Sequence, residues 1–129
     1  MYKSFREMPK IQIAELVFWL TDSLPKKEDY GLASQIRRAA LSILANIAEA
    51  FGRYHVNDKI NFYYFARGSI VETQNHLEYG CRVEYFCQED VKSIDLKLGN
   101  LYDPVNRLIK SLNSYPQSKS QPQPYGDKS

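Results

Sequence analysis

The 129-residue chain is poor in the residues that most catalytic and metal sites depend on. It contains two cysteines, two histidines and one tryptophan. His76, Cys81 and Cys87 do not follow the short paired spacing of zinc ligands. The sequence also lacks a glycine-rich phosphate loop, a Glu-x-x-His pair and a Cys–His–acid set. We therefore expect no enzyme activity, no metal, no cofactor and no small-molecule substrate.

Long apolar runs and a strong charge excess are missing too. No stretch approaches the roughly 20 apolar residues of a membrane span, and residues 1–6 lack the apolar core of a signal peptide. The net charge of +2 is too small to indicate a dedicated nucleic-acid binder. Cys81 and Cys87, read as parts of one helix, would lie about 9 Å apart, beyond disulfide reach. These features predict a cytoplasmic protein with reduced thiols and no membrane contact.

Apolar residues recur with helical periodicity in four segments, and no segment alternates like a strand. The segments cover residues 9–24, 32–54, 57–86 and 89–112. Short connections favour antiparallel neighbours, so residues 1–113 are predicted to form an all-α, antiparallel up-and-down four-helix bundle. Residues 114–129 are rich in Pro, Ser and Gln and have no apolar period, which predicts a disordered tail.

The second segment has the widest apolar arc, close to half of the helix circumference, and should contact two neighbouring helices. Its stripe is Leu32, Ile36, Ala40, Ile43, Ile47 and Phe51, flanked by Leu41, Leu44 and Ala48.

Individual residues refine the other helices. Gly68 and Gly80 each cost a helix about 1 kcal/mol relative to Ala, so a close helix contact is expected at both. Pro104 should kink or split the fourth helix. Asn57 or Asp58 is expected to cap the third helix.

A line of polar residues follows the second helix within an arc of about 80°. These residues are Arg38, Ser42, Asn46, Glu49 and Arg53, and the third helix adds Ser69, Glu72 and His76, with Arg67 nearby. Three interpretations stay open: a solvated face with i,i+4 pairs, a seam against another helix or subunit, or a nucleic-acid contact surface. Below, "polar seam" means Ser42, Asn46, Glu49, Ser69 and Glu72.

Charge is unevenly distributed along the chain. Residues 26–67 contain seven basic and four acidic residues, whereas residues 68–112 contain five basic and seven acidic ones. A basic face in the first of these regions would contact phosphates, although a mixed solvated surface is the plainer interpretation. The aromatic run 62–65 is able to stack bases, but such a run is more typical of core and interface rim. The candidate phosphate contacts are Arg37, Arg38, Arg53, Lys59 and Arg67.

Two ordered blocks carry a resemblance to a known family. The first block covers residues 30–53 and consists of Tyr30 to Leu32, Ser34 to Ala40, Ser42 with Ile43, and Ala45 to Arg53. The second block is Ala66 to Ser69 followed by Glu72. Over about residues 5–112 the chain resembles the bacterial four-helix-bundle proteins, also called the 23S rRNA intervening-sequence protein family.

The resemblance implies a four-helix bundle, and some members of the family assemble as homopentamers. A related accessory protein of diversity-generating retroelements is a basic pentameric bundle that binds reverse transcriptase and nucleic acid. We therefore hypothesise a non-enzymatic, homo-oligomeric accessory protein, with a pentamer as the expected assembly, that binds RNA or a nucleoprotein through its basic face. The alternative hypothesis is a structural or protein-interaction module that binds no nucleic acid.

Overall fold

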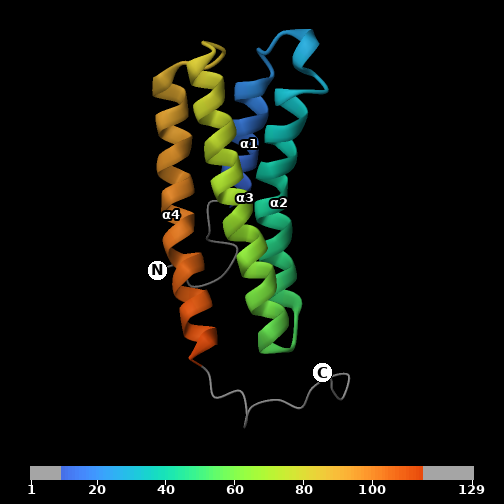
Figure 1. Cartoon of the computed structure of the whole chain (residues 1–129), viewed down its shortest axis with the longest axis vertical. Coiled ribbons are helices and arrows are strands. Elements are labelled where there is room, and N and C mark those ends of the chain that lie inside the picture. Colours follow the sequence, from blue (N-terminus) through green and yellow to red (C-terminus); the bar gives the residue numbers. More distant parts are fainter. Residues whose placement is uncertain (1–9, 115–129) are drawn as a thin grey trace.

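The computed structural model of the protein describes residues 10–114, which contain four long helices. They are α1 (Lys10–Thr21), α2 (Leu32–Gly52), α3 (Val56–Arg82) and α4 (Gln88–Asn113), with a short 3-10 turn, η2 (Lys26–Glu28), before α2. The helices lie side by side and alternate in direction (Figure 1). α1 packs on α2 and α4, and α3 packs on α2 and α4. The predicted all-α bundle is confirmed.

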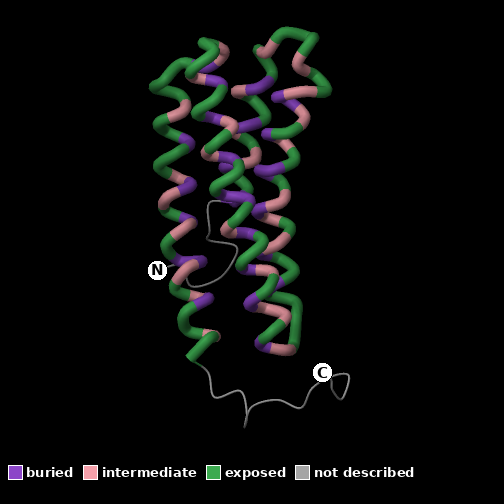
Figure 2. The backbone as a smooth tube through the Cα atoms, viewed as in Figure 1, coloured by how far each residue is buried: buried purple, intermediate pink, exposed green. Residues whose placement is uncertain are grey.

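The core is formed where the inward stripes of the four helices meet (Figure 2). α2 supplies the largest share because it packs on both α1 and α3, as its wide arc predicts. Each fully buried Ile, Leu or Val contributes roughly 1.5–3 kcal/mol relative to an exposed one. The fully buried aliphatic side chains include Ile13, Val17, Ile36, Ile43, Ile47, Ile70, Leu77, Leu98, Leu101 and Val105.

Three apolar residues that were assigned to the inward side of α2 are exposed instead: Leu41, Ala48 and Phe51. Leu41 is 54% exposed and Phe51 is 39% exposed. At 100° per residue, Leu41 points well away from the stripe that contains Ile36 and Ile43. Among the described residues α2 packs mainly on α1 and α3, which leaves Leu41 at the surface. The Phe51 ring still lies edge-on to the Tyr63 ring of α3, with the ring centroids 6.3 Å apart.

Three helices end earlier than predicted, and α2 differs least, since it ends at Gly52 rather than at residue 54. α1 ends at Thr21, whose hydroxyl donates to the Val17 carbonyl at 2.8 Å. α3 ends at Arg82, four residues before the predicted end, because the chain reverses through Glu84 at a φ of 66°. The α3 N-cap is His55, so neither Asn57 nor Asp58 holds that position as predicted.

The early end of α3 places the two cysteines differently from the prediction. Cys81 lies in α3, whereas Cys87 is the N-cap residue of α4, so they do not share one helix. The turn between them is fixed by the amides of Tyr85 and Phe86, which both donate to the Gly80 carbonyl, at 2.8 and 3.2 Å. Such bonds back to an earlier carbonyl are typical of a helix C-terminus.

The predictions for the glycines and the proline were right in part. A Cβ atom on Gly80 would overlap the ring of Phe86, so a close contact exists there, although with the α3–α4 turn rather than with a helix. Gly68 has no neighbour within 4 Å of such an atom, and the contact predicted there is wrong. α4 continues through Pro104 and is not split. Proline removes only one N–H donor, which at this position would have bonded the Asn100 carbonyl.

Across residues 10–114, no helix is both long and apolar enough to cross a membrane. Of the predicted tail, only Ser114 falls within the described residues, where it follows α4.

Candidate interaction surfaces

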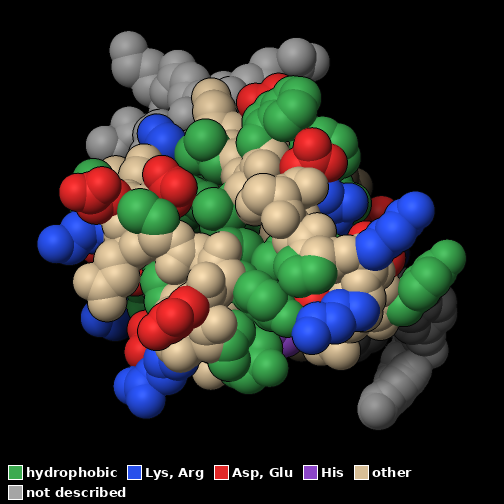
Figure 3. All heavy atoms as spheres, turned by 90° about the horizontal axis from the view of Figure 1, so that it is seen from above, with side chains coloured by type: hydrophobic (Ala, Val, Ile, Leu, Met, Phe, Trp, Pro, Cys, Tyr) green, Lys and Arg blue, Asp and Glu red, His purple; other side chains and the backbone are tan. Residues whose placement is uncertain are grey.

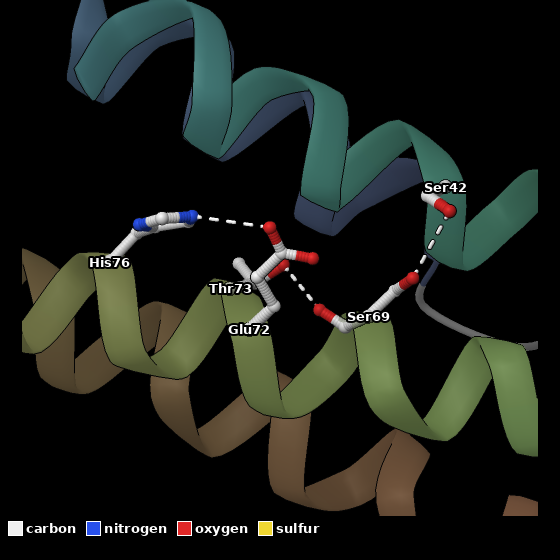
Figure 4. A network of polar contacts seen from close by, with 5 residues as sticks. All are labelled: Ser42, Ser69, Glu72, Thr73 and His76. Carbon is white, nitrogen blue, oxygen red and sulfur yellow. Dashed lines mark hydrogen bonds and ion pairs between the residues drawn. The ribbon is translucent and has the colours of Figure 1, made fainter. Parts of the chain in front are cut away.

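The inner part of the polar seam joins α2 to α3 within one chain. The Ser69 hydroxyl donates to Ser42 Oγ at 3.0 Å (Figure 4). The Asn46 side-chain amide donates to the same Ser42 oxygen at 2.9 Å and to the Ser42 carbonyl at 2.8 Å. Ser69 is buried, and Ser42 and Asn46 are half-buried. These three residues therefore match the seam interpretation, with the second helix supplied by the same chain.

The two carboxylates of the polar seam face solvent. Glu49 pairs with Arg53 at 3.1 Å along α2. Glu72 lies 3.4 Å from His76 Nε2 along α3 (Figure 4). An exposed i,i+4 ion pair such as Glu49–Arg53 contributes about 0.3–0.5 kcal/mol. This outer part of the seam matches the solvated-face interpretation.

Arg37 is held between α1 and α2. Its Nε donates to Thr21 Oγ1 at 2.7 Å, and its guanidinium lies over the Phe18 ring, 4.7 Å from the centroid. The buried Thr21 hydroxyl donates its hydrogen to a carbonyl of α1, and its oxygen accepts the bond from Arg37. Arg37 is thus a structural link between two helices, and its charge is fixed at their outer edge.

Lys59 and Arg67 are also held by contacts within the bundle. The Lys59 ammonium donates to the Ala50 carbonyl at 3.0 Å, near the C-terminus of α2, where the helix dipole favours a cation. Arg67 donates to Asn106 Oδ1 at 2.9 Å, which ties α3 to α4, and stacks on Tyr64 at 4.8 Å. Arg37 and Arg67 therefore lie at the seams of different helix pairs, and the five candidate cations do not gather on one face.

Arg53 and Arg38 are the more accessible candidates. Arg53 pairs with Glu49 and lies over the Phe62 ring, 4.8 Å from the centroid. Arg38 is exposed and forms no hydrogen bond or ion pair with any other described residue. It is the only one of the five candidates without a partner in residues 10–114.

The aromatic run at the start of α3 is divided between the core and the surface. Tyr63 is buried, and burial raises its pKa to about 12. Phe62 is half-buried, whereas Tyr64 and Phe65 are exposed. This division agrees with the interpretation as core plus rim.

Large apolar side chains reach the surface on all four helices. Trp19 of α1 is 68% exposed, and so is Leu96 of α4. Seen from above, hydrophobic surface reaches the end of the bundle among charges of both signs (Figure 3). A helix that is apolar on all sides normally has neighbours on all sides. The exposed set includes Ile11, Phe18, Trp19, Leu41, Phe65, Val71 and Leu96.

The outer side of α1 was missed by the sequence reasoning. No role was predicted for Ile11, Phe18 and Trp19. The run from Leu16 to Leu20, five apolar residues in succession, was the available signal, because a helix with one buried face does not need it.

The chemistry available to the described residues is limited. No group of three or more His, Cys, Asp or Glu side chains in residues 10–114 lies close enough to hold a metal ion. Burial raises the pKa of the Cys81 thiol, and the nearby Glu78 carboxylate acts in the same direction. A thiol whose pKa is raised is a poor nucleophile at neutral pH, because the thiolate is the reactive form.

These features define a small all-α four-helix bundle. The chain belongs to the 23S rRNA-intervening sequence protein family, whose sequence model matches residues 9–110. This confirms the family resemblance. The bundle is similar to the crystal structure of a protein of unknown function from the S23 ribosomal protein family of Bacteroides thetaiotaomicron VPI-5482. The TM-score is 0.67 with 29% identity, over 78% of this chain and 91% of that one. Comparison with curated proteins gave no match.

Proposed function

We propose that the protein is a non-enzymatic cytoplasmic accessory module that assembles with copies of itself, as a pentamer, and binds RNA or a ribonucleoprotein. The observation that carries the proposal is the exposure of large apolar side chains, among them Ile11, Trp19 and Leu41, on the outer side of α1 and α2. Monomeric proteins rarely leave large apolar patches exposed, and such patches usually mark interaction sites. The pentameric state is supported by family membership alone.

Self-assembly accounts for the exposed apolar residues of α1 and α2. Burying Ile11, Phe18 and Leu41 against another copy would stabilise the contact by about 25 cal/mol for each Å² of apolar surface removed from water. A specific interface typically buries about 800 Å² on each partner, an area that the outer side of two helices can supply.

RNA binding is supported by the family and by the cations of α2 and α3. Arg37, Lys59 and Arg67 donate to neutral groups of the protein, so their positive charge is not cancelled. One bundle offers only a few scattered contacts. An assembly of five copies would repeat each contact five times, and the affinity for a phosphate backbone rises steeply with the number of contacts.

Two measurements on the full-length chain test the proposal. Sedimentation over a range of protein concentrations should detect an oligomer. Titration with a structured fragment of 23S rRNA at about 50 and 200 mM salt should show binding that weakens strongly with salt, as expected for phosphate contacts. Arg38→Ala combined with Arg53→Ala should weaken binding. The same pair should lower the slope of log affinity against log salt by about one for each phosphate that the variant no longer neutralises.

The matched control is Arg107→Ala combined with Lys110→Ala, which removes two exposed charges from α4 instead. The control should bind RNA as the unchanged chain does. The oligomeric state of each variant is measured as well, so that a loss of RNA binding is not confused with a loss of assembly. Absence of binding at low salt, or an equal effect of both pairs, would contradict RNA binding through α2.

The second candidate function is a structural or protein-interaction module without nucleic acid. It is favoured by the dispersal of the five cations over different helix seams. An oligomer that shows no RNA binding at low salt would select this function over the first.

A further inference from the structure

A groove runs along the outside of α3 and α4. Val71, Leu96 and Gly99 supply its apolar part, and Asp95 and Asp103 are the charged residues that line it. A Cβ atom on Gly99 would have no neighbour within 4 Å, so the groove is open at that point. Neither aspartate forms a hydrogen bond or ion pair with another of the described residues. The groove is therefore an apolar surface with unpaired negative charge.

The other pair of helices presents a second apolar surface, and its charges are of both signs: Glu15 lies between Ile11 and Phe18 on α1, and Arg38 lies on α2. Ile11 and Phe18 lie two turns apart on α1, and Leu41 lies one turn beyond Arg37 on α2. The stacking of Arg37 on the Phe18 ring places these apolar residues on one face. At its edge is Arg38, the exposed cation without a partner in the described part of the chain. We call this surface the α1–α2 face.

The two surfaces also match in position along the bundle. α2 and α4 run in the same direction and begin at the same end (Figure 1). Arg38 lies six residues after the start of α2, and Asp95 lies seven residues after the start of α4. With a rise of 1.5 Å per residue, these positions are roughly 9 and 10.5 Å along their helices. By the same measure, Leu41 lies about as far from the start of α2 as Leu96 and Gly99 lie from the start of α4.

We propose that copies of this chain associate head to tail, with the α1–α2 face of one copy seated in the α3–α4 groove of the next. Arg38 pairs with Asp95 of the next copy, and Leu41 packs against Leu96 beside Gly99. The inference rests on the self-assembly proposed above and specifies its contact surfaces. Because two different surfaces meet, each copy uses one surface for each of its two neighbours. Such a head-to-tail contact forms a ring when the rotation between copies closes, and that ring can contain an odd number of copies.

Charge reversal in the full-length chain tests the ion pair. Arg38→Asp and Asp95→Arg each place like charges at the contact and should raise the dissociation constant of the assembly at least tenfold. The chain with both substitutions restores the pair in reversed order and should return to within about threefold of the unchanged protein. Arg107→Asp, on the outer side of α4 and outside the groove lining, is the matched control and should have no effect. Circular dichroism verifies that every variant is folded.

Disulfide trapping gives a second test that does not depend on the ion pair. In a chain with both native cysteines replaced by serine, Leu41→Cys and Leu96→Cys are introduced separately and together. Oxidised glutathione accepts the two electrons as paired thiols form a disulfide. The chain with both new cysteines should give a ladder of cross-linked oligomers. Each single variant should stay uncross-linked, because residues 41 and 96 meet each other and not their own copies.

The outcomes separate this inference from the proposal beneath it. A monomer at every concentration would overturn self-assembly and the head-to-tail contact together. An oligomer that resists both charge reversals would overturn the head-to-tail contact alone. So would a cross-linked dimer from Leu41→Cys by itself, since it would indicate a two-fold contact between identical faces.

Discussion

Replacement of Gly80 with alanine tests how the turn between α3 and α4 is held. In a helix interior, Gly→Ala usually stabilises a protein by about 0.5–1 kcal/mol, because alanine loses less backbone entropy on folding. At Gly80 the added methyl group would overlap the Phe86 ring, which is only 5% exposed. The Phe86 amide donates to the Gly80 carbonyl at 3.2 Å, so the ring cannot retreat without straining or breaking that bond.

The magnitude follows from two opposing contributions. Overpacking a core typically costs about 1–3 kcal/mol, and complete loss of a buried Phe side chain costs about 3–5 kcal/mol. The overlap with the ring is severe, so the cost should lie in the upper part of the first range. After subtraction of the gain in helix propensity, we expect Gly80→Ala to lower the free energy of unfolding by about 1–2.5 kcal/mol.

Urea unfolding at one fixed protein concentration measures this change, since the stability of an oligomer depends on concentration. Gly68→Ala is the matched control, because Gly68 lies in the same helix with nothing near its missing Cβ atom, and it should stabilise by about 0.5–1 kcal/mol. Combining Gly80→Ala with Phe86→Leu should destabilise less than the sum of the two single changes, since both act on one contact. If Gly80→Ala stabilises as much as Gly68→Ala, the packing of Phe86 on α3 is refuted.

Three further substitutions test contacts between different elements of the bundle. Thr21→Val removes the buried hydroxyl that links α1 to α2 and should lower the free energy of unfolding by about 1–2 kcal/mol in urea, whereas Ser23→Ala, at an exposed hydroxyl, should change it by less than about 0.5 kcal/mol. Lys59→Met keeps the apolar stem but removes the ammonium at the end of α2, and thermal unfolding should detect a loss of about 0.5–1.5 kcal/mol. The first amide of α2, followed by the Tyr85 hydroxyl, holds the pKa of Glu28 below its ordinary value of 4.5. That stabilisation is complete above pH 4.5 and disappears as the pH falls through the lower pKa of the folded state, so a pH series should show a flatter acid profile for Glu28→Gln.

The four helices could be predicted because burial on one side imposes a period of 3.6 residues on the sequence. Ile36, Ile43 and Ile47 illustrate this, since their spacing alone places them in the core. The end of α3 could not be predicted in this way. It depends on the packing of Phe86 against Gly80 and on the left-handed conformation of Glu84, and neither has a periodic signature.

The polar residues were predicted less well than the helices, for a related reason. Sequence spacing indicates which side of a helix a residue occupies, but it does not identify a partner on another helix. Arg37 finds Thr21 on α1, and Arg67 finds Asn106 on α4. A count of charges along the chain therefore grouped cations that the fold separates.

Arg38 is proposed both as a phosphate contact and as a subunit contact, and an experiment can separate the two roles. As a phosphate contact it must face RNA, whereas in the head-to-tail contact its charge is taken up by Asp95 of the next copy. The chain with Arg38→Asp and Asp95→Arg retains the contact but carries a negative charge at residue 38. If this chain assembles and binds RNA as tightly as the unchanged protein, Arg38 serves the subunit contact and the phosphate contacts lie at Arg53, Lys59 and Arg67. If it assembles but loses RNA affinity, the positive charge at residue 38 contributes to RNA binding as well as to the subunit contact.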